Sequence, residues 1–479
     1  MLRLKPFSDR ATQEQINSAL VSTNHINLGL SGRNSGSATR GSDRYNYLLP
    51  DLVKDKGNRL PETPTTVALL NELGRRMEDP GPTRGSAIPS CFTYLGQFID
   101  HDLTAMNSPR VDFTDPNLTP YTPEQIANLR NIRIPALDLD NVYAEAPYVG
   151  DDLLLIGAVA ISGGRPPGKV GNEFDLPRRD RSPDPRYDRT ARIGDPRDDE
   201  NVIAAQLHVA FMRAHNAIVK LGHTDEETRA LLRQRYQSII VHDYLERVAD
   251  PGIVAAMLAK PWPVFDPPDG QLFMPLEFAV AAFRFGHVMP RDSYNYNVTF
   301  PEPLAPLFML FNVLARYEAL PERWIIQWEN FVDGGSNTAN SLGTSMNRYL
   351  FHLRPVPLAV ADLLRGYILG LPTGQALAGA LGLRVMSDSE IASVATSRQL
   401  EILQQNNFLK ATPLWFYILA EAAFEKKGRL GQLGSTLVAG VLIALIRRSP
   451  DSFMRVAGWS PASSPRFTLQ DLLRLAEVL

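Results

Sequence analysis

The segment Ser90–Thr104 (SCFTYLGQFIDHDLT) constrains this chain more than any other, because it sets one histidine between two aspartates inside an otherwise apolar helical pattern. On a helix, Gln97 and His101 lie one turn apart on the same face. Asp100 and Asp102 then point roughly 100° to either side of His101. Carboxylates that diverge in this way do not easily bind one ion together with the histidine. The motif therefore predicts three separate roles on one rigid helix, and the alternative is a helix end with solvated acids and a hydrogen-bonded histidine.

Charge and cysteine content exclude several kinds of protein. The 49 Lys and Arg nearly balance the 52 Asp and Glu, so we expect no nucleic-acid partner and no charged membrane surface as partner. The single cysteine, Cys91, excludes an internal disulfide framework and is expected to be a small buried hydrophobe. The most apolar run, Thr436–Ile446, is shorter than the roughly 18 residues of a membrane span and is closed by Arg447 and Arg448. It predicts a buried core helix.

The amino terminus has no continuous apolar core of the length that a secretory signal needs. We therefore expect a protein that stays in the cytoplasm or is exported without a cleaved leader. The sequence sets no oligomeric state.

Helical periodicity dominates the chain, alternating strand patterns are scarce, and no internal repeat is found. We expect a mainly α protein in which residues 61–479 form a single large helical domain with long loops and little β structure. Residues 1–60 are expected to form a partly irregular arm, and residues 174–200, dense in Pro, Arg and Asp, a long surface loop. Helices are expected at Thr65–Arg76, Ser90–Thr104, Asp199–Leu221, Leu276–Met289, Pro306–Ala319, Leu358–Leu369, Pro413–Lys426, Ser435–Arg448 and Leu469–Leu479.

The helix expected at Leu276–Met289 carries Arg284 and His287 one turn apart, with Gly286 permitting a close approach. A planar cofactor held between helices needs an axial ligand on one side, a polar catalytic group on the other and apolar walls elsewhere. His287 has the surroundings of such a ligand, although a hydrogen-bonded core histidine fits the same spacing.

The helix expected at Asp199–Leu221 begins in a cluster of acids and arginine, DPRDDE. Its acids Asp198 and Asp199 suit a first helical turn, where carboxylates meet the helix dipole. His208 and His215 lie two turns apart on the same helix and face the same way.

Three motifs taken in order, GQFIDHDLT, DPRDDEN with LHVAFMRAHN following, and AFRFGH, resemble the peroxidase-cyclooxygenase superfamily of haem proteins. Within it, the likeness is to the animal-type haem peroxidases. It extends from about Ser90 to the LRGYILGLPTG stretch at Gly374, and PLWFYILAEA, Pro413–Ala422, resembles the bacterial branch. Each motif alone is weak evidence, whereas the ordered set is specific.

The resemblance implies haem b as cofactor and assigns roles by position. His101 matches the family's distal histidine, Gln97 the glutamine near the distal water and halide site, and Arg197 the distal arginine. His287 matches the proximal ligand of the haem iron, and Arg284 the arginine that meets a haem propionate.

The resemblance also implies covalent attachment and a calcium ion. Asp100 and Glu200 fall where family members form ester bonds to the haem. Asp102 matches a calcium ligand, which agrees with its direction away from Asp100 on the helix. The rest of that site would come from the PALDLD segment: Asp138, Asp140 and the backbone carbonyl of Ala136.

Three positions depart from the family pattern. Asn201 stands where some members have a methionine bonded to the haem, so that linkage should be missing. Ile134 replaces the usual threonine of the calcium loop and offers its backbone carbonyl alone, which weakens the predicted site. Asp362, in ADLLRG, replaces the asparagine partner of the proximal histidine. A carboxylate accepts the imidazole N–H more strongly and makes His287 a richer donor to iron, which predicts a low Fe(III)/Fe(II) potential.

The function implied is that of a haem peroxidase. Neutral His101 would take a proton from hydrogen peroxide and return it to the outer oxygen, while Arg197 stabilises the charge on that oxygen. The resulting ferryl haem would be reduced by small organic donors or by a halide. Two alternatives stay open. One is a fatty-acid oxygenase that uses a tyrosyl radical, for which Tyr317 lies in the right region without a clear motif. The other is a non-catalytic haem-binding protein.

Overall fold

The structure is a computed structural model that describes most of the chain after residue 42. The described ranges are 43–79, 81–82, 84–184, 188–259, 265, 272–300, 302–304, 319–352, 355–449, 451–456, 459 and 466–479. Most of the expected arm, almost the whole expected helix Pro306–Ala319, and Tyr317 lie outside them. The division of the chain at residue 60 stays a prediction.

Helices dominate the described residues. The periodicity of the sequence located seven of the α-helices to within a few positions and did not predict others, among them the 15-residue helix Asp225–Ile239. The α-helices are α2 (Pro50–Lys54), α3 (Pro64–Arg75), α4 (Cys91–Leu103), α5 (Pro123–Ala127), α6 (Asp140–Tyr143), α7 (Val202–Lys220), α8 (Asp225–Ile239), α9 (Leu245–Val248), α10 (Pro251–Ala259), α11 (Leu276–Val280), α13 (Arg348–Phe351), α14 (Leu358–Ile368), α15 (Gly374–Ala380), α16 (Asp388–Val394), α17 (Ser397–Leu403), α18 (Leu414–Glu425), α19 (Gln432–Arg448) and α20 (Leu469–Leu475).

Tighter and wider turns supplement these helices. The 3₁₀ turns are η1 (Lys56–Asn58), η2 (Pro196–Asp199), η5 (Ala282–Val288), η6 (Glu322–Trp324), η7 (Trp328–Asn330) and η8 (Phe453–Arg455). A π-helical turn, η3 (Ile240–Tyr244), joins α8 to α9.

The strands of the described residues are short and pair in twos. They are β1 (Tyr45–Asn46), β2 (Glu78–Asp79), β3 (Gly85–Pro89), β4 (Met106–Asn107), β5 (Arg130–Asn131), β6 (Tyr148–Val149), β7 (Leu153–Leu154), β8 (Gly157–Ala158), β9 (Glu173–Asp175), β10 (Met274–Pro275), β11 (Thr338–Asn340) and β12 (Met346–Asn347). The pairs are β1 with β10, β3 with β11, β2 with β12, β4 with β5, β6 with β7 and β8 with β9. The expectation of little β structure is confirmed.

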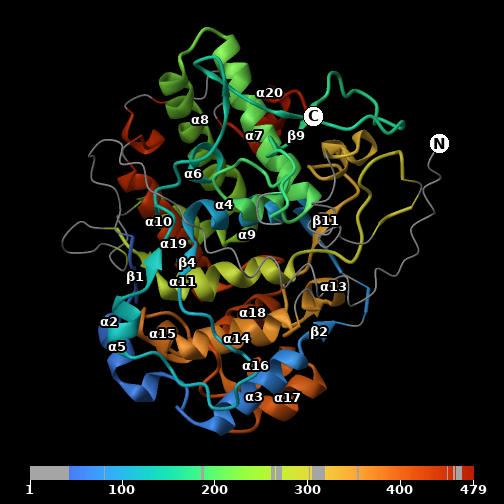
Figure 1. The fold of residues 1–479 in the computed structure, drawn as a ribbon. Coiled ribbons are helices and arrows are strands. Elements are labelled where there is room, and N and C mark those ends of the chain that lie inside the picture. The colour runs from blue at the N-terminus through green and yellow to red at the C-terminus, as the bar shows by residue number, and fades with distance from the viewer. Residues whose placement is uncertain are drawn as a thin grey trace.

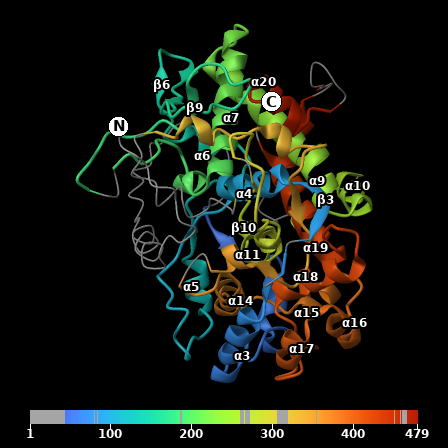
Figure 2. The same cartoon turned by 90° about the vertical axis from the view of Figure 1, so that its right-hand side faces the viewer.

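Two groups of helices enclose the middle of the molecule. Figures 1 and 2 show α7, α8 and α20 at one end, α3, α14, α17 and α18 at the other, and α4 and α11 between them. Elements far apart in sequence pack together, since α3 contacts both α14 and α17. One hydrophobic cluster extends from Tyr45 to Val478, so the described residues share a common core.

Helix α4 lies inside this core and not on its surface. Its residues Asp100, His101 and Asp102 are buried together with the apolar ones, so the solvated helix end considered as the alternative is wrong. The helix ends at Thr104, which is extended at φ −133° and whose N–H reaches the Asp100 carbonyl at 2.8 Å. Polar side chains buried in this way need partners inside the protein.

The prediction of one helix over Leu276–Met289 is wrong. Helix α11 ends at Val280, Ala281 leaves the helical region at φ −133° and ψ −68°, and the 3₁₀ turn η5 follows. The Arg284 side chain donates from Nε to the carbonyl of Ala279 at 2.9 Å, a carbonyl that a continuous helix would pair with a backbone N–H. Apolar spacing alone does not reveal such a competing side chain.

Helix α7 begins later than expected. Its N-cap is Asn201, whose side chain accepts the N–H of Ala204 at 2.8 Å, and the preceding acids belong to η2. Asp198 and Asp199 are therefore not first-turn acids of α7, and that interpretation is wrong. A 3₁₀ turn forms here because Asp195 caps the N–H of Arg197 at 2.9 Å directly after Pro196 enters the turn.

The expected surface loop, residues 174–200, is partly buried. Leu176 and Ile193 belong to the core, and Arg178 binds the carboxylates of Asp175 and Asp199 at 2.9–3.1 Å. Composition suggested solvent here because it does not show that Arg178 pairs with Asp175, three residues before it, and with Asp199, 21 residues after it. Along the described ranges, every helix is too short or too polar to cross a lipid bilayer.

Candidate active site

A cavity of about 420 Å³ lies between α4 on one side and the segment α11–η5 with α14 on the other. This volume falls in the usual range of ligand pockets, about 300–1,000 Å³. The structure brings every residue predicted to face the haem to its wall: Gln97, Asp100, His101, Arg197, Glu200, Arg284, His287 and Asp362. These side chains come from four separate stretches of sequence, so the fold assembles the set that the motifs proposed.

His101 is held by Asp198, which the sequence suggested only as a first-turn acid of the following helix. Its Nδ1 lies 2.7 Å from Oδ1 of Asp198, and the other oxygen of Asp198 lies 2.9 Å from Nδ1 of His208. Asn141 also donates to Asp198 Oδ2, at 3.0 Å. Burial by itself would raise the pKa of Asp198, but the hydrogen bonds from His101 and His208 outweigh burial and lower it.

An ionised Asp198 fixes the tautomer of His101. Because the carboxylate accepts the Nδ1–H, neutral His101 carries its lone pair on Nε2, the nitrogen left for the cavity. His208 also contacts Asp198 through Nδ1, but it does not line the cavity. The signal available in the sequence was Asn201, a residue type that favours the N-cap of a helix. A helix that begins after Asn201 leaves Asp198 in the preceding turn, from which it can reach α4.

Arg197 is anchored along one edge of its guanidinium. Nε and Nη2 donate to Asp195 at 3.0 and 2.7 Å, and Nη2 also reaches the carbonyl of Thr104 at 2.6 Å. Asp195 in turn accepts Nε of the buried Arg133 at 3.0 Å. Burial would raise the pKa of Asp195, yet the charge of Arg197 outweighs it and lowers this pKa. Nη1 of Arg197 remains directed to the Asp100 side, 3.9 Å from Oδ2.

Asp100 and Arg284 bind each other across the cavity wall. Nη1 of Arg284 donates to Asp100 Oδ2 at 2.9 Å, and Thr104 donates its hydroxyl to Oδ1 at 2.9 Å. Burial would raise the pKa of Asp100, but the charges of Arg284 and Arg197 hold it below its usual value. Asp102 meets the N–H groups of Leu139 and Asn141 instead, so the predicted divergence of the two acids is confirmed.

His287 is anchored on the opposite wall. Its Nδ1 lies 2.7 Å from Oδ2 of Asp362, the partner that the alignment to ADLLRG predicted. This contact leaves Nε2 as the nitrogen that can bind a metal in the cavity. Gly286 faces open space, because a Cβ built there would meet no atom within 4 Å among the described residues.

Gln97 and Glu200 complete the predicted set. Gln97 accepts the Asn201 side-chain N–H through Oε1 at 3.2 Å, so Asn201 both caps α7 and orients Gln97. Glu200 follows η2 directly and lines the cavity beside Arg197.

The segment predicted to bind calcium lies against Asp102 without forming a ligand cage. Asp102 is fully buried; burial raises its pKa well above the usual value, and the charges of Asp138 and Asp140 raise it further. Asp140 lies 3.5 Å from Nη1 of Arg133, which supplies a positive charge. Across the described ranges, no group of three or more His, Cys, Asp or Glu side chains is arranged to hold a metal ion. The calcium site at Asp102, Ala136, Asp138 and Asp140 stays a prediction.

Two tyrosines of the cavity wall were not predicted from the sequence. Tyr45, from β1, donates its hydroxyl to Asn131 at 3.2 Å. Tyr244, the last residue of the π-helical turn η3, packs so closely on α4 that a Cβ at Gly96 would lie 2.7 Å from its hydroxyl. Turns of this type often mark functional sites, but a single sequence gives no sign of them.

A family model described as animal haem peroxidase matches residues 136–406, more than half of the 479 residues. The chain belongs to the animal haem peroxidase family. The matched range contains DPRDDEN, AFRFGH and ADLLRG, so the resemblance drawn from the motifs is confirmed. A peroxidase-like protein of Margaritifera margaritifera is 31% identical over 124 residues, which cover 23% of this chain and 16% of that protein.

Solved structures share the fold at low sequence identity. Peroxidase A of Dictyostelium discoideum is 16% identical with a TM-score of 0.55, over 88% of this chain and 87% of that one. The fatty acid α-dioxygenase of Oryza sativa is 12% identical with a TM-score of 0.53, over 92% and 79%. That of Arabidopsis thaliana is also 12% identical, with a TM-score of 0.54, over 92% and 76%. The mainly α peroxidase fold is therefore confirmed.

Family membership implies haem, and the cavity fits it. Its volume suits a planar cofactor, its walls carry two anchored histidines from opposite sides, and Gly286 leaves space beside His287. His287 would hold the iron and Arg284 a propionate. Binding would place the haem next to the ion pair between Arg284 and Asp100.

Proposed function

We propose that this protein is a haem peroxidase that reduces hydrogen peroxide and oxidises small organic donors or a halide. The observation that carries the proposal is the pairing of His101 with the buried carboxylate of Asp198, which leaves a basic Nε2 for the cavity opposite His287. A histidine that only packs in the core also needs a hydrogen-bond partner. Such a histidine has no need of a second nitrogen that faces a cavity of ligand size.

The haem, when bound, would supply the iron that binds peroxide and at which the O–O bond breaks. His101 takes the peroxide proton on Nε2, and Asp198 stabilises the imidazolium that forms. The same nitrogen then gives the proton to the outer oxygen, so that water leaves. Arg197, fixed by Asp195, places positive charge beside the oxygen that becomes negative.

The test begins with the absorption spectrum of the purified, haem-supplied protein. A Soret band that changes on addition of peroxide, followed by oxidation of a phenol or of halide, is expected. A protein without a Soret band after haem supply would overturn the proposal. His101→Ala should retain the band and lose the reaction with peroxide; unchanged reactivity would instead favour a non-catalytic haem-binding protein.

Covalent attachment through Asp100 or Glu200 belongs to this proposal. Asp100 is held ionised by Arg284, and a carboxylate oxygen is the atom that an ester bond requires. Extraction with acidified organic solvent should leave haem on the protein. Asp100→Asn and Glu200→Gln, tested separately, would then show which side chain carries the link, and full extraction from the wild type would exclude both.

A fatty-acid oxygenase is the second candidate. It is favoured by Tyr244, which brings a phenol to the cavity wall, and by the shared fold with two fatty acid α-dioxygenases. Oxygen uptake with a polyunsaturated fatty acid, lost in Tyr244→Phe, would favour this candidate. Peroxide-dependent oxidation of phenols without oxygen uptake would favour the first.

Calcium at Asp102 is also part of the proposal. It is supported by the concentration of three carboxylates, whose mutual repulsion a divalent cation would relieve. Added Ca²⁺ should raise the melting temperature of the wild type but not of Asp102→Asn. An unchanged melting temperature of the wild type in Ca²⁺ and in chelator would exclude the site.

A further inference from the structure

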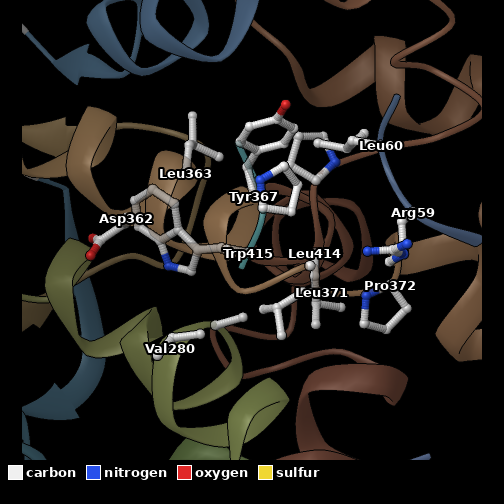
Figure 3. A pocket seen from close by; sticks show the side chains of 15 residues that line it. Arg59, Leu60, Val280, Asp362, Leu363, Tyr367, Leu371, Pro372, Leu414 and Trp415 are labelled. Atoms are coloured by element: carbon white, nitrogen blue, oxygen red, sulfur yellow. The ribbon is translucent and has the colours of Figure 1, made fainter. Parts of the chain in front are cut away.

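A second, smaller cavity of about 20 Å³ is lined by Asp362 and other residues of α14, by Val280 of α11 and by the start of α18. Figure 3 shows Asp362 and the indole of Trp415 toward one end of it and Arg59 toward the other. Asp362 lines both this cavity and the large one, so this residue lies between them. A volume of this size accommodates one or two water molecules, since each requires about 10–15 Å³.

Two buried N–H groups line this small cavity without a partner in the described part of the chain. One is Nε1 of Trp415, on α18, a side chain whose residue is 2% exposed. The other is Nε of Arg59. A buried donor without an acceptor is costly, and native proteins satisfy nearly all of them with protein atoms or ordered water. Two such donors around one water-sized cavity indicate that it is hydrated.

Asp362 provides the acceptor that a water in this cavity would need. Its Oδ2 accepts the Nδ1–H of His287 at 2.7 Å. Within the described ranges, no hydrogen bond reaches its other oxygen, Oδ1. The remaining wall near Asp362 is apolar, with Val280, Leu363 and Leu414 among its residues.

We propose that this cavity is a water-binding site in which a resident water accepts the N–H of Trp415 and donates to Oδ1 of Asp362. Trp415 is then a positioning residue: it acts on the iron through the water, Asp362 and His287. The water site depends on protein atoms alone, whereas its effect on iron rests on the proposed function.

The direction of this effect follows from charge. A water that donates to Oδ1 stabilises the carboxylate and lowers its basicity, so that the shared proton stays closer to Nδ1 of His287. Without the water, Asp362 draws that proton more strongly, and His287 gains imidazolate character. The Asp362 carboxylate thus makes His287 a stronger electron donor to iron. The water held by Trp415 limits this increase in donor strength.

The test compares Trp415→Phe with a matched control. Phenylalanine keeps an aromatic ring in the core and removes the N–H. Trp328→Phe removes an equally buried indole, 1% exposed, that lines neither cavity. Crystal structures of the wild type and both variants should show a water between Trp415 Nε1 and Asp362 Oδ1 that is lost in Trp415→Phe alone.

The second readout is the iron–histidine stretching frequency of the ferrous haem protein, measured by resonance Raman spectroscopy. It should rise in Trp415→Phe and stay unchanged in Trp328→Phe, because a stronger donor forms a stiffer bond. An unchanged frequency in Trp415→Phe would overturn the positioning role.

A wild-type crystal without water beside Trp415 Nε1 would overturn the site itself. This result needs no variant, so it decides the question even if Trp415→Phe does not fold. A protein that binds no haem would refute the proposed function. The water site would still be tested separately, because the haem-free crystal shows whether a water lies beside Trp415 Nε1.

Discussion

Replacing Asp198 with asparagine tests the central contact of the site. The Asp198 side chain is fully buried. Its two oxygens accept hydrogen bonds from His101 Nδ1, His208 Nδ1 and the Asn141 side chain at 2.7, 2.9 and 3.0 Å. An asparagine of the same shape removes the charge and turns one of the two oxygens into an N–H₂ donor. If that donor faces His101, the imidazole must place its proton on Nε2, and it can no longer accept a proton from peroxide.

The magnitudes follow from the type of bond. A hydrogen bond to a charged group contributes about 1.5–3 kcal/mol, and one between neutral groups about 0.5–1.5 kcal/mol. Losing the charge on two histidine contacts should therefore lower the free energy of unfolding by about 2–3 kcal/mol. Loss of the general base should slow the reaction with peroxide by about 10²–10⁴-fold.

Stopped-flow absorbance of the haem protein mixed with peroxide measures the rate, and urea unfolding measures the stability. Asp199→Asn is the matched control, because Asp199 is the next residue and binds Arg178, away from the cavity. Its rate constant should equal that of the wild type. If Asp198→Asn also reacts at the wild-type rate while binding haem normally, the assignment of Asp198 as the residue that sets the tautomer of His101 is refuted.

Three further predictions concern other parts of the molecule. Asp362→Asn should raise the Fe(III)/Fe(II) potential in spectroelectrochemical titration, because His287 loses a charged acceptor; an unchanged potential would contradict this. Glu277 is fully buried and burial raises its pKa from 4.5 to about 7, so its folded form holds a proton that the unfolded chain releases. The contribution of this carboxyl to stability is complete below pH 4.5 and is lost, by about 3 kcal/mol, as the pH rises through 7. Urea unfolding should therefore show Glu277→Gln gaining stability over the wild type between pH 5 and 8. Parallel stability curves for the two proteins would contradict this prediction. Gly374→Ala should destabilise by about 2–3 kcal/mol in the same assay, since its Cβ would lie 2.0 Å from Cγ of Tyr417, whereas Gly379→Ala, with 3.9 Å to Val385, should be neutral or stabilising.

The sequence by itself determined several of the longer helices and the faces that they present. A period of 3.6 residues located α4, α14, α18 and α19 to within a few positions, and it set Asp100 and Asp102 on diverging sides of His101. These properties are local, because the helix geometry that links neighbouring residues is the same in every fold. The ordered motifs added the family and its expected haem residues, and the fold gathers those residues around one cavity.

Only the tertiary structure decided which charges meet. Asp198 lies 97 residues from His101, and Arg284 lies 184 residues from Asp100, so no local pattern could show either pair. The same holds for the end of α11, which depends on the Arg284 side chain reaching the Ala279 carbonyl. Buried polar groups must find partners wherever the folded chain brings them. Helix periodicity set Gln97 and His101 on one face of α4, and the motif resemblance indicated Asp362 as the partner of His287. Packing alone selected Asp198 and Asp195 as the carboxylates that hold His101 and Arg197 in place.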